Sequence, residues 1–158
     1  MISMDRRLLL GLLAAAGVSF AARAPRAAAP LRMMVSKDPG CGCCNGWVEH
    51  IRAAGIEVEA IDTGELDAVK RRLGVPAELA ACHTAEIGGY VIEGHVPAAA
   101  VKRLLAERPA ATGLAVPGMP IGSPGMEVPG QPDEIYDAIL FGPAGHQRFA
   151  RFQGHRQL

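Results

Sequence analysis

Lys37-Asp-Pro-Gly-Cys-Gly-Cys-Cys-Asn-Gly-Trp47 joins the first predicted strand to the first predicted helix and places three thiols at their junction. Residues 31–36 form a short apolar run that ends at turn residues, which predicts a buried strand. After Cys44, apolar residues recur three or four positions apart, and Gly55 supplies a helix stop. The stretch therefore predicts a strand, a turn and a helix with the cysteines at its N-terminus.

The segments that follow this junction alternate between strands and helices. They are a strand at 56–61, a helix opened by a capping box at 62–65 and buried through Leu66, Val69 and Leu73, a hairpin at 83–93 around Gly88-Gly89, and a helix from Pro97 to Pro109. The order β-α-β-α-β-β-α is that of a thioredoxin-like domain, so the fold class predicted is α/β with a single domain.

Two segments near the C-terminus are harder to assign. Residues 112–132 hold five prolines and five glycines, too many for a regular element, but also several apolar residues. We expect an ordered Gly/Pro/Met-rich loop packed against the domain, because flexible linkers are rarely so apolar. The C-terminal extension at 134–152 is consistent with one or two strands or a short helix.

The first 29 residues have the layout of an export signal, with Arg6 and Arg7 before an apolar run from Leu8 to about Ala22. The run is shorter than the roughly 20 residues of a spanning helix, and the paired arginines suggest the twin-arginine route as much as the general one. We expect a signal peptide at 1–29 and a metal-binding domain at 30–158, without stable membrane insertion after cleavage. The alternative is an uncleaved membrane anchor.

The charge of the chain argues against nucleic acid as a partner. The sequence has 16 basic and 16 acidic residues, but the first 29 residues hold four arginines and one aspartate. The remaining 12 basic and 15 acidic residues give the mature part a small negative net charge, which suits no polyanion.

The three clustered cysteines have a position that favours reactive thiolates. A helix N-terminus stabilises negative charge, so thiols there are expected to ionise near neutral pH. Cys41 and Cys44 have C-x-x-C spacing, which can close a disulfide or chelate one ion. Cys43 is not needed by a redox pair, and a third thiolate is useful where thiolates bridge several metal ions.

Cys82 is the fourth candidate ligand, because the predicted topology brings the start of the hairpin beside the start of the first helix. Soft thiolates select Cu(I) or Zn(II), and zinc sites typically use two separated C-x-x-C pairs. The predicted metal ligands are therefore Cys41, Cys43, Cys44 and Cys82, with Cu(I) as the ion, held singly or as a multinuclear cluster. The alternative is a structural disulfide from Cys41 or Cys43 to Cys82.

Two histidines and two methionines could extend the site. His83 and His95 are candidate ligands or tuning groups, against surface or capping roles. Met119 and Met126 carry soft thioethers, against a role as packing residues. The sequence has no phosphate-binding loop, serine elbow or H-E-x-x-H motif, so any enzyme reading depends on the cysteines.

The mature chain resembles the CopG-like copper-resistance family through four motifs, which are residues 37–47, Ala81-Cys-His-Thr84, Gly94-His-Val-Pro97 and residues 113–127. The resemblance implies a periplasmic thioredoxin-like domain whose four cysteines hold copper in a thiolate-bridged cluster, with a role in copper tolerance. Three functions then compete. They are copper sequestration, an oxidoreductase in which Cys41 attacks and Cys44 resolves, and transfer of copper to another periplasmic protein through residues 112–132.

Overall fold

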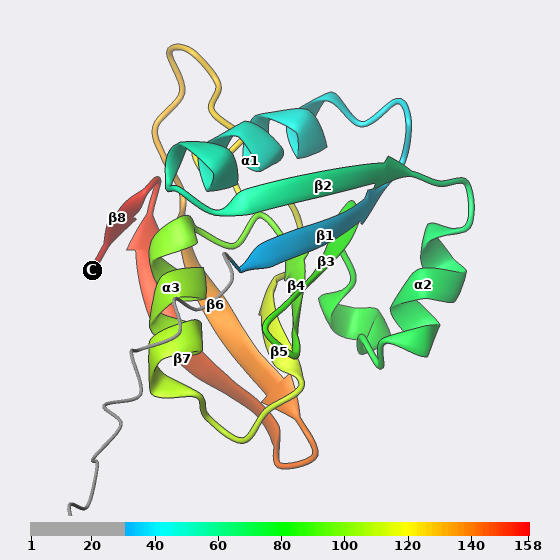
Figure 1. Ribbon diagram of the computed structural model, residues 1–158. Coiled ribbons are helices and arrows are strands. Elements are labelled where there is room, and N and C mark those ends of the chain that lie inside the picture. The colour runs from blue at the N-terminus through cyan, green and yellow to red at the C-terminus, as the bar shows by residue number, and fades with distance from the viewer. Residues whose placement is uncertain (1–30) are drawn as a thin grey trace, which may run out of the picture.

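The computed structural model describes residues 31–158 and shows a mixed α/β domain with one eight-stranded sheet and three α-helices (Figure 1). The elements in chain order are β1 (Arg32–Lys37), α1 (Gly42–Ala53), β2 (Glu57–Asp62), α2 (Leu66–Arg72), the 3-10 helix η1 (Ala77–Leu79), β3 (His83–Ile87), β4 (Tyr90–Gly94), α3 (Ala98–Glu107), β5 (Gly113–Val116), β6 (Ile135–Gly142), β7 (Gly145–Gln153) and β8 (Arg156–Gln157).

The sheet has the strand order β2-β1-β3-β4-β5-β6-β7-β8. β1 pairs in parallel with β2 and antiparallel with β3, and β4 pairs in parallel with β5. The predicted hairpin is present, and both glycines of its turn have positive φ, 57° at Gly88 and 88° at Gly89. Such φ values are those of the type I′ turns that join twisted antiparallel strands.

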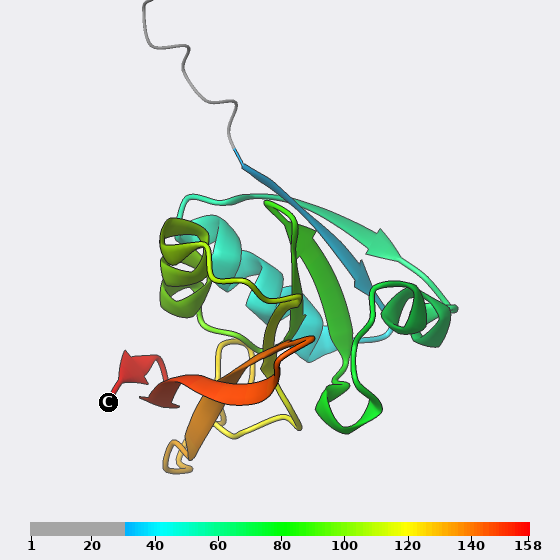
Figure 2. The same ribbon diagram turned by 90° about the horizontal axis from the view of Figure 1, so that it is seen from below.

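Helices cover both faces of the sheet (Figures 1 and 2). The larger core lies under α1 and α3 and joins their residues Trp47, Ile51 and Leu104 to Met33 and Ile92 of the sheet. The opposite face holds a smaller cluster of Leu79, Val91, Ala115 and Phe141, near α2 and η1. Since successive residues of a strand point to opposite faces, β4 contributes Val91 to one cluster and Ile92 to the other.

The prediction that residues 112–132 contain no regular element is wrong at one end. Residues 113–116 form β5, which is buried throughout and pairs with β4 and β6. Gly113 suits this position because a Cβ there would lie 1.9 Å from the Val91 carbonyl oxygen. Residues 134–152 form two strands, β6 and β7, which agrees with the strand alternative and excludes the helix, and the short β8 follows them.

The second helix differs from its predicted burial. Leu66, Val69 and Leu73 are only half-buried, whereas Lys70 is buried with a relative exposure of 7%. The expected capping box is absent as well, because the Glu65 N–H is bonded to the Thr63 hydroxyl at 3.0 Å and no side chain caps the helix. The spacing of apolar residues therefore predicted correctly that this segment is a helix, but it did not predict which residue of α2 is most buried.

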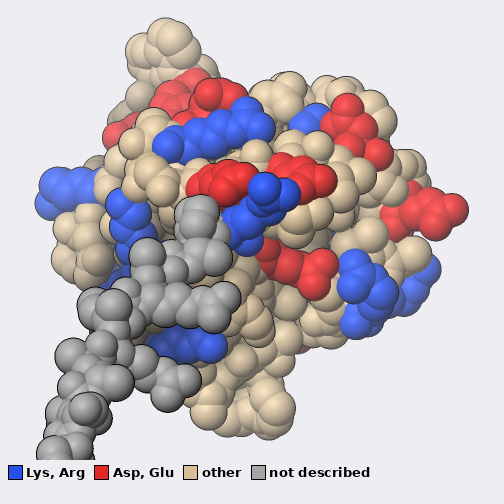
Figure 3. Space-filling model, in the orientation of Figure 1, with Lys and Arg blue, Asp and Glu red and all other residues tan. Residues whose placement is uncertain are grey.

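The surface shown in Figure 3 carries both signs of charge close together. Arg32 of β1 lies between two carboxylates of β2, 2.8 Å from Glu57 and 3.1 Å from Glu59. The predicted signal peptide lies outside the described residues. Within residues 31–158, each helix is too short or too polar to cross a lipid bilayer.

Candidate metal centre

The N-cap and first turn of α1 hold three of the four cysteines, as predicted. Cys41 is the N-cap residue, and its Sγ accepts a hydrogen bond from the Cys44 backbone N–H at 3.3 Å. A sulfur here replaces the oxygen of the usual capping residues and satisfies one of the unpaired N–H groups of the first turn. The helix therefore starts where the cysteines stand.

Cys41 and Cys44 are joined by a disulfide, while Cys43 and Cys82 have free thiols. The C-x-x-C pair has thus closed in the way its spacing allows. The alternative of a disulfide to Cys82 is not the pairing found. In this state Cys41 and Cys44 carry no thiolate, so the expectation of three ionised thiols concerns the reduced chain.

Cys82 meets the other cysteines because β1 and β3 are neighbours. Lys37 at the end of β1 pairs with His83 at the start of β3, which brings residue 82 to the turn before α1. The four Sγ atoms all lie within 4.8 Å of one another, with Cys41 and Cys43 3.5 Å apart. The proximity of Cys82 predicted from the topology is confirmed.

The Cys82 thiol is poorly placed to ionise without a metal. Burial, followed by the charge of the neighbouring Cys43, raises the pKa of Cys82 to about 12. A buried thiol gives up its proton readily when a cation takes its place, since the cation supplies the charge that the surroundings lack. Metal binding at Cys82 should therefore release a proton at neutral pH.

His83 and His95 lie next to Cys82 and are both fully buried. Cys82 Sγ is 3.0 Å from His95 Nε2 and 3.4 Å from His83 Nδ1. The ligand atoms of these three residues lie within 4.8 Å of one another. From the sequence, each histidine could lie either on the surface or at the metal site. Their buried positions exclude the surface role.

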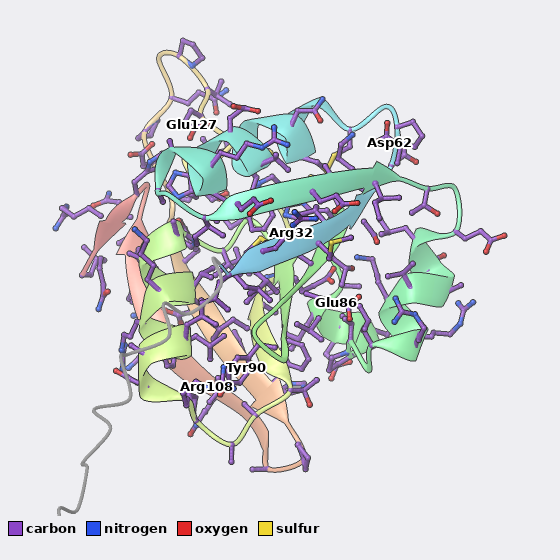
Figure 4. The ribbon with its side chains drawn as sticks, in the orientation of Figure 1. Arg32, Asp62, Glu86, Tyr90, Arg108 and Glu127 are labelled. Atoms are coloured by element: carbon purple, nitrogen blue, oxygen red, sulfur yellow. A yellow bond between two sulfur atoms is a disulfide. The ribbon has the colours of Figure 1, made fainter. Side chains whose placement is uncertain are left out.

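The loop between β5 and β6 closes over this region. The Pro124 carbonyl accepts a hydrogen bond from His95 Nδ1 at 2.8 Å. Gly125 has φ +86°, and a Cβ there would lie 2.5 Å from the Cys43 carbonyl oxygen and 2.6 Å from the Trp47 nitrogen. Glu127, labelled in Figure 4, accepts a hydrogen bond from the Gly125 N–H at 3.0 Å. The expected packing of this loop against the domain is confirmed.

The two candidate methionines lie on the same loop. Met119 is 53% exposed and Met126 is half-buried. Val128 is also exposed, at 37%. The exposure of Met119 disagrees with a packing role, whereas the half-buried Met126 is compatible with one.

A buried ion pair that the sequence did not indicate supports the segment before Cys82. Lys70 Nζ donates to Glu93 Oε1 at 2.5 Å and to the Thr84 hydroxyl at 2.8 Å. Glu93 is fully buried and also accepts a hydrogen bond from the Ala81 N–H at 2.6 Å. Burial raises the pKa of Glu93, while the bonds from Lys70, Thr84 and Ala81 oppose that rise. The carboxylate thus fixes the backbone that presents Cys82.

The buried imidazoles make the metal-free protein sensitive to acid. Burial lowers the pKa of His83 well below its ordinary value and also lowers that of His95. The unfolded chain therefore takes up protons on these rings at a higher pH than the folded chain does. Stability should be full above about pH 6.5 and fall below it by up to about 1.4 kcal/mol per pH unit for each ring, until its folded pKa is reached.

Urea unfolding of the metal-free protein across this pH range measures the effect. His95→Gln should show a shallower fall in the free energy of unfolding than the parent chain. His146→Ala on the exposed part of β7 is the matched control and should keep the parent slope. Equal slopes for the parent and His95→Gln would contradict the assignment.

The fold and the cluster define a single-domain α/β protein whose cysteines are arranged so that they can bind metal. Two solved structures titled copper resistance protein copG, forms 2 and 1, match it at 42% sequence identity with a TM-score of 0.74. They cover 78% and 80% of this chain, and the matches span 99% and 100% of those chains. The chain belongs to the family of the copper resistance protein CopG.

A family model described as a protein of unknown function, DUF411, matches residues 79–126. This segment runs from the end of η1 to the loop over α1, and so includes Cys82, His83 and His95. Curated proteins give no match.

Proposed function

We propose that this protein binds Cu(I) through the thiolates of Cys41, Cys43, Cys44 and Cys82 and contributes to copper tolerance outside the cytoplasm. One observation carries the proposal, which is that four sulfurs from two distant segments lie within 4.8 Å of one another. On this view β1 to β4 with α1 to α3 are a thioredoxin-like core, extended by β5 to β8, and residues 1–29 direct export.

The donor set favours a soft ion. Thiolates prefer Cu(I), Zn(II) and iron–sulfur clusters, whereas oxygen ligands suit magnesium and calcium. Three of the sulfurs come from one helical turn, an arrangement too crowded for the separated pairs of ordinary zinc sites. Thiolates that crowd together can each bridge two ions, and the related solved structures are those of copper resistance proteins.

Reduction of the Cys41–Cys44 disulfide is a condition of this binding, because a disulfide sulfur carries no thiolate. The reduced cysteines would then hold copper at the positive end of the α1 dipole, where negative thiolate charge is stabilised. Burial of Cys44 and partial burial of the other sulfurs would limit the access of water and oxidants.

The test is the ratio of copper to protein after anaerobic loading of the reduced mature chain with Cu(I). We expect several copper ions per chain, and a collapse of this ratio in Cys43→Ser, because Cys43 supplies a bridging sulfur that a single-ion site does not need. Met119→Ala, which alters an exposed side chain, is the control and should keep the parent ratio. A ratio of one or less, unchanged in Cys43→Ser, would refute the cluster.

The disulfide in the structure favours a second function, thiol oxidoreductase activity. In the reduced chain Cys41 would attack a substrate disulfide and release one thiol, and Cys44 would then displace the other thiol as the Cys41–Cys44 bond forms. Both electrons pass to the substrate, and two protons accompany the released thiols. Cys43→Ser should spare this activity, which separates it from copper storage.

A further inference from the structure

We propose that Cys82, His83 and His95 form a second metal site, for a single divalent ion, that persists when Cys41 and Cys44 are joined in a disulfide. Copper as its physiological ion depends on the proposed function, whereas the site itself depends on the geometry of these three residues. The ligand class is a mixed nitrogen and sulfur set, which shares only Cys82 with the four sulfurs of the proposed cluster.

The three side chains already have the spacing of ligands to one ion. An ion with bonds of about 2.0 Å to nitrogen and 2.3 Å to sulfur holds neighbouring ligand atoms about 3.5 Å apart. Cys82 Sγ lies 3.4 Å from His83 Nδ1 and 3.0 Å from His95 Nε2. Small outward shifts of the His95 ring and the thiol would admit the ion.

The hydrogen bond on the far side of the His95 ring prepares it as a ligand. A carbonyl oxygen can only accept, so the contact with Pro124 requires the proton to be on Nδ1. In the neutral ring Nε2 then has a free lone pair, and this atom faces Cys82. A second hydrogen bond that fixes tautomer and ring orientation is the usual companion of a metal-bound histidine.

His83 is difficult to explain as a packing residue alone. Its ring is fully buried, and its Nε2 has no hydrogen-bond partner among residues 31–158. A buried polar atom without a partner costs free energy, so an apolar residue would serve the core better. Coordination through Nδ1 would give the ring a strong interaction in return.

The charge around the site is compatible with a cation. The buried ammonium group of Lys70 is neutralised by Glu93 at 2.5 Å. Glu127, which accepts a hydrogen bond from the Gly125 N–H next to Pro124, adds a negative charge on the covering loop. The bound thiolate of Cys82 would neutralise one of the two charges of the ion.

The disulfide state of the chain makes this site separable from the cluster. Two of the four cluster sulfurs are removed by the Cys41–Cys44 bond, whereas both imidazoles and Cys82 are untouched. Two nitrogens and one sulfur suit Cu(II) and other borderline divalent ions. When the disulfide forms, the chain is thus expected to lose its site for soft Cu(I) and to keep a site that binds a divalent ion.

The experiment uses Co(II), which reports sulfur ligation by a charge-transfer absorption and tetrahedral geometry by its visible bands. The mature chain is oxidised until two of its four thiols remain. It is then titrated with Co(II) in the absence of oxygen. We expect a single Co(II) per chain with a sulfur charge-transfer band. Cys82→Ser should abolish the band, and His95→Ala should weaken binding at least about tenfold.

Two further variants separate the loss of a metal ligand from a general loss of structure. His146→Ala is the matched histidine control and should bind Co(II) as the parent does. His95→Gln preserves most of the side-chain volume, so weakened binding in a variant that still unfolds cooperatively in urea excludes a folding defect as the cause.

The outcomes separate this inference from the proposed function. Oxidised parent chain that fails to bind Co(II), or His95 variants that bind it as tightly as the parent, would overturn the second site even if the reduced chain takes up several Cu(I) ions. Reduced chain that fails to bind Cu(I), beside oxidised chain that binds Co(II) through Cys82 and His95, would refute the cluster and leave this site standing.

Discussion

Glu93→Ala is expected to lower the free energy of unfolding by about 3–5 kcal/mol, because it leaves the buried ammonium of Lys70 without its counter-charge. Glu93 is fully buried and the Lys70 side chain is only 9% exposed, so water replaces little of the lost interaction. The change also leaves the N–H of Ala81 without its acceptor. Urea unfolding of the metal-free protein measures the loss.

A second variant separates the ion pair from simple packing. When both partners of a buried pair are replaced by apolar residues of similar volume, stability is often recovered or exceeded. Lys70→Met combined with Glu93→Leu should therefore be markedly more stable than Glu93→Ala alone. Should the double variant be as unstable as the single one, the uncompensated charge is not the cause.

The same pair should affect metal binding, since Glu93 fixes the backbone that precedes Cys82. The double variant restores the core but not the hydrogen bond to Ala81. If that bond positions the thiol, copper binding in the double variant remains weaker than in the parent although its stability recovers. This difference distinguishes a positioning role from a purely structural one.

Elements set by local sequence could be predicted well. The Gly88-Gly89 turn requires positive φ at two adjacent residues, and the spacing around it leaves one hairpin register. The start of α1 follows from the turn at 38–40 and from a cysteine able to cap. The cysteine cluster could be predicted because the order of elements brings residue 82 back to that turn.

Features set by contacts between distant residues could not be predicted. β5 begins a segment, residues 112–132, with the glycine and proline content of a loop, and is a strand because β4 and β6 supply partners on both sides. Lys70 and Glu93 are 23 residues apart, and nothing in either local pattern indicates that they are buried together. The burial of His83 follows from its position at the start of β3, a strand that lies between β1 and β4. Its chemistry, however, depends on the nearby His95.

Trp47→Ala is expected to cost about 3–5 kcal/mol of stability, the usual range for removing a buried tryptophan. The ring is fully buried under α1, and its Nε1 donates to the Val96 carbonyl at 2.8 Å. Trp47→Phe should cost less, about 1–3 kcal/mol, because it keeps most of the packing but leaves that carbonyl unpaired. Met119→Ala, on the exposed loop, should stay within about 0.5 kcal/mol of the parent.

The tryptophan also links the core to the proposed ligands. Its ring centroid lies 4.3 Å from that of His83, and its hydrogen bond holds the residue after His95. Trp47→Phe should therefore weaken Co(II) binding by the oxidised chain although neither ligand is changed, because both imidazoles lose part of their support. If the Trp47→Phe variant is destabilised but its Co(II) affinity is unaltered, the imidazoles are positioned by β3 and by the loop between β5 and β6 alone. Trp47 would then contribute only to stability.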